Sequence, residues 1–297
     1  MVSPTLGVQQ QFDNGQVNNL TTTIGRAAIS NDTQLNVTGD GWIRASSGSA
    51  DVLAATVSDT SVVSLSGDGT ISAFTSGTGD ATAVVLEDSA QLFLSGGSIS
   101  AATDQGGSTA VLLNDSAHLS ITGGSIGSST GTGPGSGVVA NGSSTVDFSA
   151  GALSSVRFDA NDNSSINVSG GSNSFARFNS NGNSTFTVSG GNFGTGTFTA
   201  NDFSNFIISG VNPRNVNAND EGTILIYGSN FNLGFGEVEG TSGTITGDLQ
   251  DGTPFSFNYQ RASQATIVLA VPEPSSLALL TLAGALLAGR RNRRRSH

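Results

Sequence analysis

The segment NSTFTVSGGNFGTGTFTAND, residues 183–202, is the third of three consecutive segments that share one length and one pattern. The two before it are SSTVDFSAGALSSVRFDAND, residues 143–162, and NSSINVSGGSNSFARFNSNG, residues 163–182. Apolar and polar residues alternate within each segment, and this is the period of a β-strand rather than of a helix. Self-similarity at a fixed period indicates a repeat architecture in which each segment forms one coil.

The repeat extends in both directions from this stretch. Four longer coils precede it, at positions 33–59, 60–88, 89–115 and 116–142. One slightly shorter coil, 203–220, follows, and residues 8–32 read as a degenerate first coil. The longer coils differ by an extra loop rich in Gly, Ser and Thr, at residues 46–51, 75–80, 103–108 and 128–136. We expect these loops to emerge together at one corner.

Aligning the coils places apolar residues in columns. The first strand of each coil contributes Leu35, Val63, Leu92, Leu119, Val146, Ile166, Phe186 and Phe206, and two positions later Val37, Leu65, Leu94, Ile121, Phe148, Val168, Val188 and Ile208. A second strand contributes Ile43, Ile71, Ile99, Ile126, Leu153 and Phe193, and a third contributes Val84, Val111, Val138, Phe158, Phe178, Phe198 and Val216. Stacked coils would pair equivalent strands about 4.8 Å apart. The sequence therefore predicts an all-β, right-handed parallel β-solenoid.

Glycine and Asx residues recur where each coil must turn. Glycine pairs such as Gly96-Gly97 and Gly190-Gly191 allow positive φ between the first two strands. Each coil closes on an Asn or Asp: Asp32, Asp59, Asp88, Asp115, Asn141, Asp162, Asn181, Asp202 and Asp220. These residues tolerate left-handed backbone, and stacked asparagines can hydrogen-bond along the solenoid. A calcium ladder is the alternative, but the calcium-binding nonapeptide and EF-hand spacings are missing, so we favour structural corners.

The repeat decays over residues 221–271. Ile224 and Ile226 extend the two leading columns. The runs SGTITGDL, TPFSFNYQR and ATIVLAV then predict antiparallel strands, with Asp251-Gly252 as a turn. A solenoid needs such a cap because its last coil otherwise exposes unpaired strand edges.

Composition excludes several kinds of site. The chain has no cysteine, so it has no disulfide, metal thiolate or thiol nucleophile. All eleven basic residues are arginines, and five of them lie in residues 272–297, where the net charge is +4. That leaves a charge of −15 on residues 1–271, which disfavours nucleic acid as a partner. No nucleotide-binding loop, zinc spacing or catalytic triad is present, and no cofactor is expected.

An enzyme reading remains the least favoured alternative. Parallel β-helices include polysaccharide-degrading enzymes, and Asp159, Asp162 and Asp202 lie near one corner, where a carboxylate pair could act as acid and base. The same residues coincide with the structural corners. His118 occupies an outward position on a first strand and is expected to be solvated, and Trp42 is expected in the core or the cap. We therefore expect no catalytic activity.

The C-terminal residues 272–297 differ from the rest of the chain. Pro272-Glu273-Pro274 is followed by an apolar stretch and then by arginines at 290, 291, 293, 294 and 295. Residues 275–289 would form about 22 Å of helix, which is short for a hydrocarbon core of about 30 Å. It could span a membrane with local thinning or with snorkelling arginines, which would stay cytoplasmic. We expect one short transmembrane helix here.

This order of Pro-Glu-Pro, short helix and basic tail resembles the PEP-CTERM sorting signal of exported Gram-negative and planctomycete proteins. The resemblance implies recognition through Pro272, Glu273 and Pro274, with Arg290, Arg291, Arg293, Arg294 and Arg295 as the stop. It also implies cleavage by an exosortase, a membrane transpeptidase, after a transient inner-membrane anchor. The GTITG...DGTPF pattern resembles the stretch before this tail in planctomycete members, and the repeats resemble autotransporter-like β-solenoids.

The chain is thus expected to have four parts: a degenerate N-terminal coil (1–32), solenoid repeats (33–220), a terminal coil and β cap (221–271) and the sorting signal (272–297). The N-terminal residues MVSPTLGVQQQFDNGQ lack the regions of a secretory signal peptide. We expect a start codon assigned too late, or else a fragment. The function expected is that of an exported structural or adhesive protein at the cell surface or in exopolysaccharide. A carbohydrate-binding module on the same scaffold is the first alternative.

Overall fold

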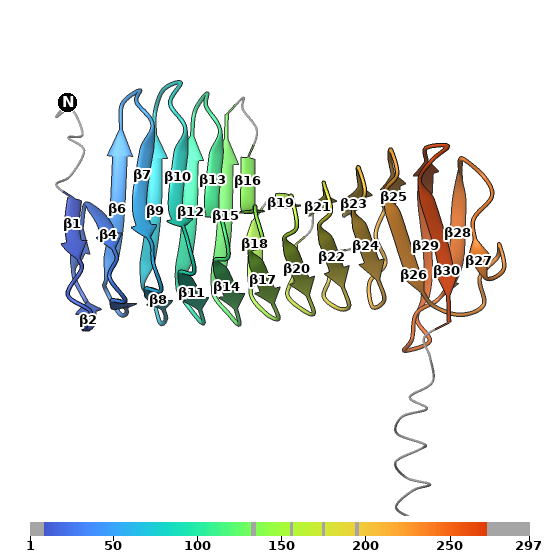
Figure 1. Ribbon diagram of the computed structural model, residues 1–297, viewed down its shortest axis with the longest axis horizontal. Helices are drawn as coiled ribbons and strands as arrows, with labels where there is room; N and C mark the ends of the chain where they lie inside the picture. Colours follow the sequence, from blue (N-terminus) through green and yellow to red (C-terminus); the bar gives the residue numbers. More distant parts are fainter. Residues whose placement is uncertain (1–8, 132–134, 155–156, 174–175, 194–195, 272–297) are drawn as a thin grey trace, which may run out of the picture.

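The computed structural model describes residues 9–131, 135–154, 157–173, 176–193 and 196–271. These residues form an elongated all-β structure in which successive coils lie side by side along one axis (Figure 1). Equivalent strands of neighbouring coils pair in parallel, so the predicted parallel β-solenoid is confirmed. The predicted transmembrane helix at 275–289 falls outside the described residues.

Each coil up to residue 162 contributes strands to three sheets, which are numbered in chain order within a coil. Among the described residues, the later coils contribute strands to sheets 1 and 3 only. Sheet 1 contains β2 (Val17–Leu20), β5 (Gln34–Val37), β8 (Val62–Leu65), β11 (Gln91–Leu94), β14 (His118–Ile121), β17 (Thr145–Phe148), β20 (Ser165–Val168), β22 (Thr185–Val188), β24 (Asn205–Ile208), β26 (Thr223–Tyr227), β30 (Thr266–Ala270) and β27 (Gly236–Glu237). Sheet 2 contains β3 (Thr23–Ile24), β6 (Trp42–Ser47), β9 (Thr70–Thr75), β12 (Ser98–Thr103), β15 (Ser125–Thr130) and β18 (Ala152–Ser154). Sheet 3 contains β1 (Gln9–Phe12), β4 (Arg26–Ile29), β7 (Val52–Val57), β10 (Ala81–Leu86), β13 (Ser108–Leu113), β16 (Gly135–Ala140), β19 (Arg157–Ala160), β21 (Arg177–Ser180), β23 (Thr197–Ala200), β25 (Asn215–Ala218), β29 (Pro254–Arg261) and β28 (Ser242–Asp248).

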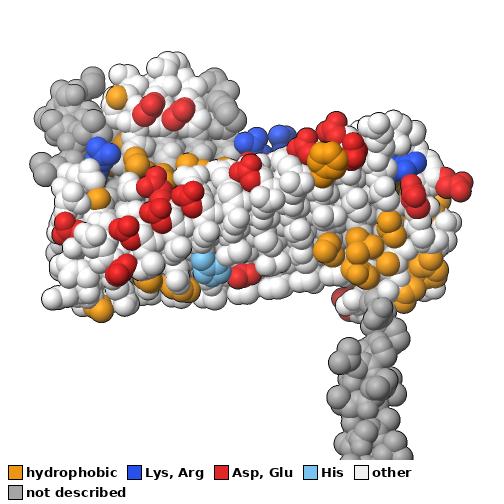
Figure 2. Space-filling model, in the orientation of Figure 1, with side chains coloured by type: hydrophobic (Ala, Val, Ile, Leu, Met, Phe, Trp, Pro, Cys, Tyr) orange, Lys and Arg blue, Asp and Glu red, His pale blue; other side chains and the backbone are white. Residues whose placement is uncertain are grey.

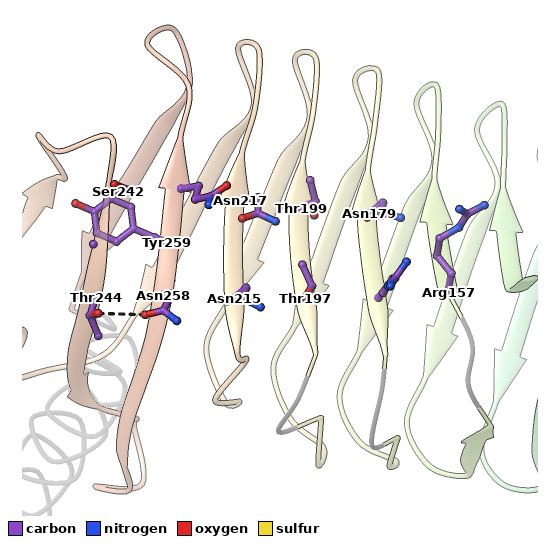
Figure 3. Close-up of a pocket in the computed structure, with 13 residues that line it drawn as sticks. Arg157, Asn179, Thr197, Thr199, Asn215, Asn217, Ser242, Thr244, Asn258 and Tyr259 are labelled. Atoms are coloured by element: carbon purple, nitrogen blue, oxygen red, sulfur yellow. Dashed lines mark hydrogen bonds between the residues drawn. The ribbon is translucent and has the colours of Figure 1, made fainter. Parts of the chain in front are cut away.

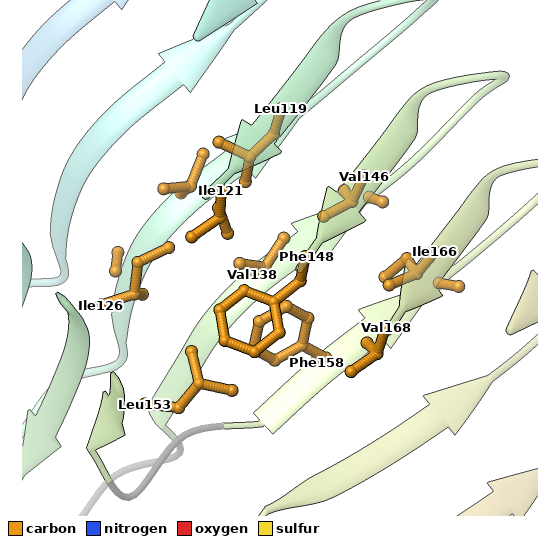
Figure 4. Close-up of a cluster of buried hydrophobic side chains, with 14 of the residues drawn as sticks. Leu119, Ile121, Ile126, Val138, Val146, Phe148, Leu153, Phe158, Ile166 and Val168 are labelled. Atoms are coloured by element: carbon orange, nitrogen blue, oxygen red, sulfur yellow. The ribbon is translucent and has the colours of Figure 1, made fainter. Parts of the chain in front are cut away.

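The core runs the length of the solenoid between the sheets. Leu92 pairs in register with Leu119, and Leu119 with Val146, and all three side chains are fully buried. Figure 4 shows how leucine, isoleucine, valine and phenylalanine side chains from consecutive coils meet inside the shaft. All the columns predicted from the repeat are buried. Burial of these apolar columns is the main force that holds the coils together.

The shorter coils fill the same shaft with larger side chains. Phe148, Phe158, Phe178, Phe186, Phe193, Phe198 and Phe206 are all buried and all lie in coils that begin at or after residue 143. Phe178 contacts four other rings, with centroids 5.1 to 5.7 Å away. A coil with fewer inward-facing positions keeps a dense core only if each position carries more volume, so phenylalanine replaces smaller residues.

The four longer coils carry an extension that the sequence predicted as loops. Strands of sheet 2 run on into it as far as Ser47, Thr75 and Thr103, so the loops are shorter than expected. Its interior is lined by small side chains such as Ala73, Ala83 and Ala101, all buried. Small residues allow the two sheets to approach closely there. The extension stands at one corner of the first coils (Figure 1), as predicted.

Two glycines with different roles form the corner between the first two strands of the coil at 183–202. Gly191 has φ of 109°, in the region that disfavours other residues. Gly190 has another constraint, because a Cβ added there would lie 2.4 Å from the carbonyl oxygen of Ser169 in the preceding coil. The first glycine therefore permits close stacking and the second permits the turn.

The closing corners combine a left-handed residue with an asparagine ladder. The left-handed residue is aspartate in most coils, such as Asp88 with φ of 57°, but it is Gly142 or Gly182 where we expected the preceding Asn141 or Asn181. That expectation was wrong by one position, because these asparagines belong to a second row. The row consists of Asn114, Asn141, Asn161, Asn181, Asn201 and Asn219, linked amide to amide at 2.7 to 3.0 Å.

The C-terminal cap is only partly antiparallel. β28 pairs antiparallel with β29 through a turn at Asp251-Gly252, as predicted. Hydrogen bonds from Thr253, first of all from its backbone N–H, hold the pKa of the Asp251 carboxyl below its ordinary value. However, β29 pairs in parallel with β25, and β30 pairs in parallel with β26. The prediction that TPFSFNYQR and ATIVLAV form only an antiparallel cap was wrong, because their apolar residues still match the columns below and complete one more coil.

Candidate functional site

A shallow polar groove lies on the outer face of sheet 3, over the shorter coils and the cap. It has a volume of about 840 Å³ and is lined by residues of β19, β21, β23, β25, β29 and β28. These coils lie between the taller first coils and the long strands of the cap (Figure 1). Because the coils become shorter from residue 143, the groove lies lower than the coils before it and the cap after it (Figure 1).

Strand register arranges the outward side chains of the groove in two rows. The first row runs Arg157, Arg177, Thr197, Asn215, Asn258 and Thr244. The second runs Asp159, Asn179, Thr199, Asn217, Gln260 and Ser242. Figure 3 shows side chains from successive strands at similar heights along the groove. Because strands repeat about every 4.8 Å, the rows offer hydrogen-bonding groups at regular intervals.

Charge is concentrated at the β19 end of the groove. The Arg157 Nε lies 2.6 Å from the Asp159 carboxylate, and its guanidinium also donates to the Ser136 hydroxyl at 3.0 Å. Asp159 is buried and accepts a further hydrogen bond from Asn179 at 2.7 Å. Arg177 is the register neighbour of Arg157 and is exposed, and no carboxylate in the described part of the chain pairs with it. Its donors remain accessible to a ligand.

The rest of the groove is uncharged and largely amide or hydroxyl. Thr244 donates to the Asn258 side chain at 3.1 Å, the one bond drawn in Figure 3. The lining residue Tyr259 is almost buried, with 5% of its surface exposed, so it offers no ring for a sugar to stack on. The groove can therefore bind a ligand by hydrogen bonds to amides and hydroxyls, with one guanidinium as a charged anchor.

The residues considered for catalysis are not brought together. The Asp162 carboxylate accepts the backbone N–H of Gly142, and that of Asp202 accepts the N–H of Gly182, each at 2.9 Å. These two aspartates lie two coils apart, which is on the order of 10 Å. Asp159 is held separately by Arg157 and Asn179. In the residues that the structure describes, no group of three or more His, Asp or Glu side chains is placed to hold a metal ion.

Two aromatic residues also have defined positions. His118 lies on the outer face of sheet 1, half-buried, with Nδ1 2.8 Å from the Thr145 hydroxyl. Trp42 was predicted in the core or cap, but it is 39% exposed on the outer face of sheet 2. The prediction was wrong because Ile43, the next residue, takes the inward position of that strand.

Sequence reasoning did not single out the groove. The signal was present in the outward positions of the third strand, where Arg157 and Arg177 occupy equivalent places in adjacent repeats. Each polar residue there is unremarkable by itself. Only the stacking of coils brings the rows together.

Residues 270–295 match the PEP-CTERM protein-sorting motif. The chain is a PEP-CTERM protein. The motif implies an exported protein, associated with the cell envelope and processed by an exosortase. Pro272, Glu273, Pro274 and the arginines from 290 to 295 fall within the matched segment and outside the described residues.

No curated protein and no solved structure matches this PEP-CTERM protein, so its likeness to autotransporter repeats stays a prediction. Within the described residues, no helix has the length and apolar character needed to span a bilayer.

Proposed function

We propose that this PEP-CTERM protein is a structural or adhesive component of the cell surface or of the extracellular polysaccharide. In this proposal, residues 275–289 anchor the new chain in the inner membrane, with Arg290, Arg291, Arg293, Arg294 and Arg295 on the cytoplasmic side. An exosortase then cleaves near Pro272-Glu273-Pro274 and releases the solenoid to its destination. The sorting motif supports export, and the rod-like repeat architecture supports a structural role.

The sorting step has a direct test in the mass of the mature protein. We expect the protein from cells with an exosortase to lack the residues beyond the Pro-Glu-Pro motif. The protein from cells without the enzyme should keep them. A Pro272→Ala, Glu273→Ala, Pro274→Ala variant should resemble the second case even when the enzyme is present. An intact tail in both strains would contradict the sorting proposal.

A second candidate function is carbohydrate binding in the polar groove. The observation that favours it is the pair of regular rows, in which amide and hydroxyl groups extend over the five strands β21, β23, β25, β29 and β28. Sugar hydroxyls both donate and accept hydrogen bonds, which suits Asn, Gln and Thr side chains. The net charge of −15 on residues 1–271 disfavours a densely acidic chain. We therefore propose a neutral or sparsely charged glycan, with Arg177 able to bind an occasional carboxylate.

Paired substitutions on opposite faces test this candidate. Thr199 and Asn217 are register neighbours in the groove, and Thr185 and Asn205 are register neighbours on sheet 1. We expect Thr199→Ala/Asn217→Ala to weaken glycan binding by about thirtyfold, because two hydrogen bonds worth roughly 1 kcal/mol each are lost. Thr185→Ala/Asn205→Ala should leave binding unchanged. The measurement is affinity for a panel of soluble polysaccharides.

Equal effects of the two double variants would contradict a binding site in the groove. The same panel also tests the enzyme alternative, because a polysaccharide-degrading enzyme would release new reducing ends during the incubation. We expect binding without such release.

A further inference from the structure

The outward face of sheet 1 changes character in its last coils. At one register position, β5, β8, β14, β17, β20 and β22 carry Asn36, Ser64, Ser120, Asp147, Asn167 and Thr187. Phe93 of β11 is the exception in this series. The next strands, β24, β26 and β30, carry Ile207, Leu225 and Val268 at the same position. A polar row thus becomes an apolar row over the final three coils.

Exposed apolar residues of the cap continue this row. Phe235 is 61% exposed, Leu233 48% and Val271 50%. Phe235 directly precedes Gly236, which pairs with Leu269 of β30, so this residue lies at the edge of the same sheet. We call these residues the apolar patch: Ile207, Leu225, Val268, Leu233, Phe235 and Val271. Figure 2 shows hydrophobic side chains gathered over the C-terminal coils, away from most acidic side chains of that view.

The core does not require this patch. The buried positions of the same strands are already filled by Phe206, Ile224 and Ile267, each fully buried. An outward Thr or Asn serves the earlier coils equally well, as in β20 and β22. Contiguous apolar surface rimmed by polar residues is typical of an interaction site. One charged pair at the rim is already neutralised, with Arg261 2.9 Å from Glu237.

The position of the patch in the chain indicates its occupant. Val271 belongs to the patch, and the segment matched as a sorting motif extends from residue 270 to 295. Leu277, the first residue of the apolar run, is six residues beyond Val271, a reach of about 20 Å when fully extended. If that run enters a bilayer, the patch is held within about the same distance of the lipid surface.

We propose that the apolar patch rests on the surface of the bilayer while the sorting tail is still attached. The inference rests on the anchored stage of the proposed function. Branched aliphatic and aromatic side chains partition into the membrane interface, and Phe235 suits that depth. The acidic domain disfavours anionic lipid, so the surface is one of zwitterionic headgroups. Contact at the patch fixes the orientation of the rod and presents Pro272-Glu273-Pro274 at the membrane.

A single-cysteine probe can test this contact because the chain has no cysteine of its own. Leu233→Cys places an environment-sensitive fluorophore in the patch. Phe93→Cys places it on the same sheet, at a residue 38% exposed but far along the rod. The full-length chains are reconstituted into phosphatidylcholine and phosphatidylethanolamine vesicles. We expect both to float with the vesicles and only the probe at 233 to shift its emission to shorter wavelength.

A variant that restores the earlier polar row makes the test specific. Leu225→Thr/Val268→Thr, combined with Leu233→Cys, should still float but lose most of the emission shift. If the Leu233→Cys chain floats with the vesicles but its fluorophore emits as it does in water, the proposed contact of the patch with lipid is wrong. The anchored stage would still stand in that case. Failure to float would overturn the anchored stage and the contact with it. An emission shift of the probe at 233 in the absence of vesicles would also overturn the proposal. If that shift depended on protein concentration, a second copy of the chain would be the group that covers the patch. If it did not, the chain's own C-terminal tail would cover it.

Discussion

Asparagine at a closing corner stabilises the solenoid through its side-chain amide. Asn181 donates to the Asn161 side chain at 2.8 Å and accepts from Asn201 at 2.7 Å. The aspartate that follows Asn201 in the chain has a different task, because the Asp202 carboxylate accepts the N–H of Gly182 in the coil before. Both residues therefore tie one coil to the next, and this use of their oxygen atoms favours structural corners over a calcium ladder.

Removing one amide from the ladder should weaken the solenoid. Asn181→Ala leaves the amide of Asn201 and the carbonyl of Asn161 without their ladder partner, in a half-buried position. We expect a loss of about 1–3 kcal/mol in the free energy of unfolding, measured by urea denaturation. Asn205→Ala, at an exposed position of sheet 1, is the control and should change it by less than about 0.5 kcal/mol. A similar loss in both variants would contradict a special role for the ladder.

Among the elements, the short strands of the second half depend on their phenylalanines. β21 has only four residues, and its Phe178 packs against rings from sheets 1 and 3 and from the corner between them. A four-residue strand has few backbone hydrogen bonds to its neighbours, so burial of one large ring supplies much of its stability.

Truncation of this ring should be among the most damaging single changes. Phe178→Ala opens a cavity among four other rings, and we expect a cost of about 3–5 kcal/mol. Phe203→Ala removes the same group from a site that is 62% exposed and should be nearly neutral. Thermal unfolding followed by circular dichroism compares the two. The expectation fails if both variants melt at the temperature of the unaltered protein.

For the whole molecule, the coil is the unit of construction. Strands β19, β21 and β23 recur at one constant spacing along the chain and pair residue for residue, from Phe158 to Phe178 and from Phe178 to Phe198. Each coil contacts mainly its two neighbours, so stability is approximately a sum over coils and their interfaces. The cap protects one end by placing the antiparallel strands β27 and β28 at the sheet edges.

Deletion of one whole coil should therefore be tolerated. Without residues 163–182, β17 can pair with β22 and β19 with β23 in the same register, so the apolar columns remain continuous. We expect a soluble monomer with an unchanged strand spectrum and a rod shorter by about 4.8 Å, measured by circular dichroism and small-angle scattering. Deletion of residues 163–172, half a coil, removes β20 without β21 and should cause misfolding or aggregation. Equal damage from both deletions would contradict the coil as the unit.

The sequence by itself determined the parallel stacking, the columns of the core and the sorting motif, because each depends on a pattern that recurs at fixed spacing or on contiguous residues. The hand of the winding stays a prediction from the chirality of parallel connections. Tertiary structure alone decided where TPFSFNYQR and ATIVLAV pair. An alternating apolar and polar pattern is compatible with a parallel or an antiparallel neighbour, so the pattern does not specify which strand lies beside it. It also decided the polar groove and the apolar patch. Their residues are tens of positions apart in the chain, and only the pairing of coils places Arg157 beside Arg177, or Leu225 beside Val268.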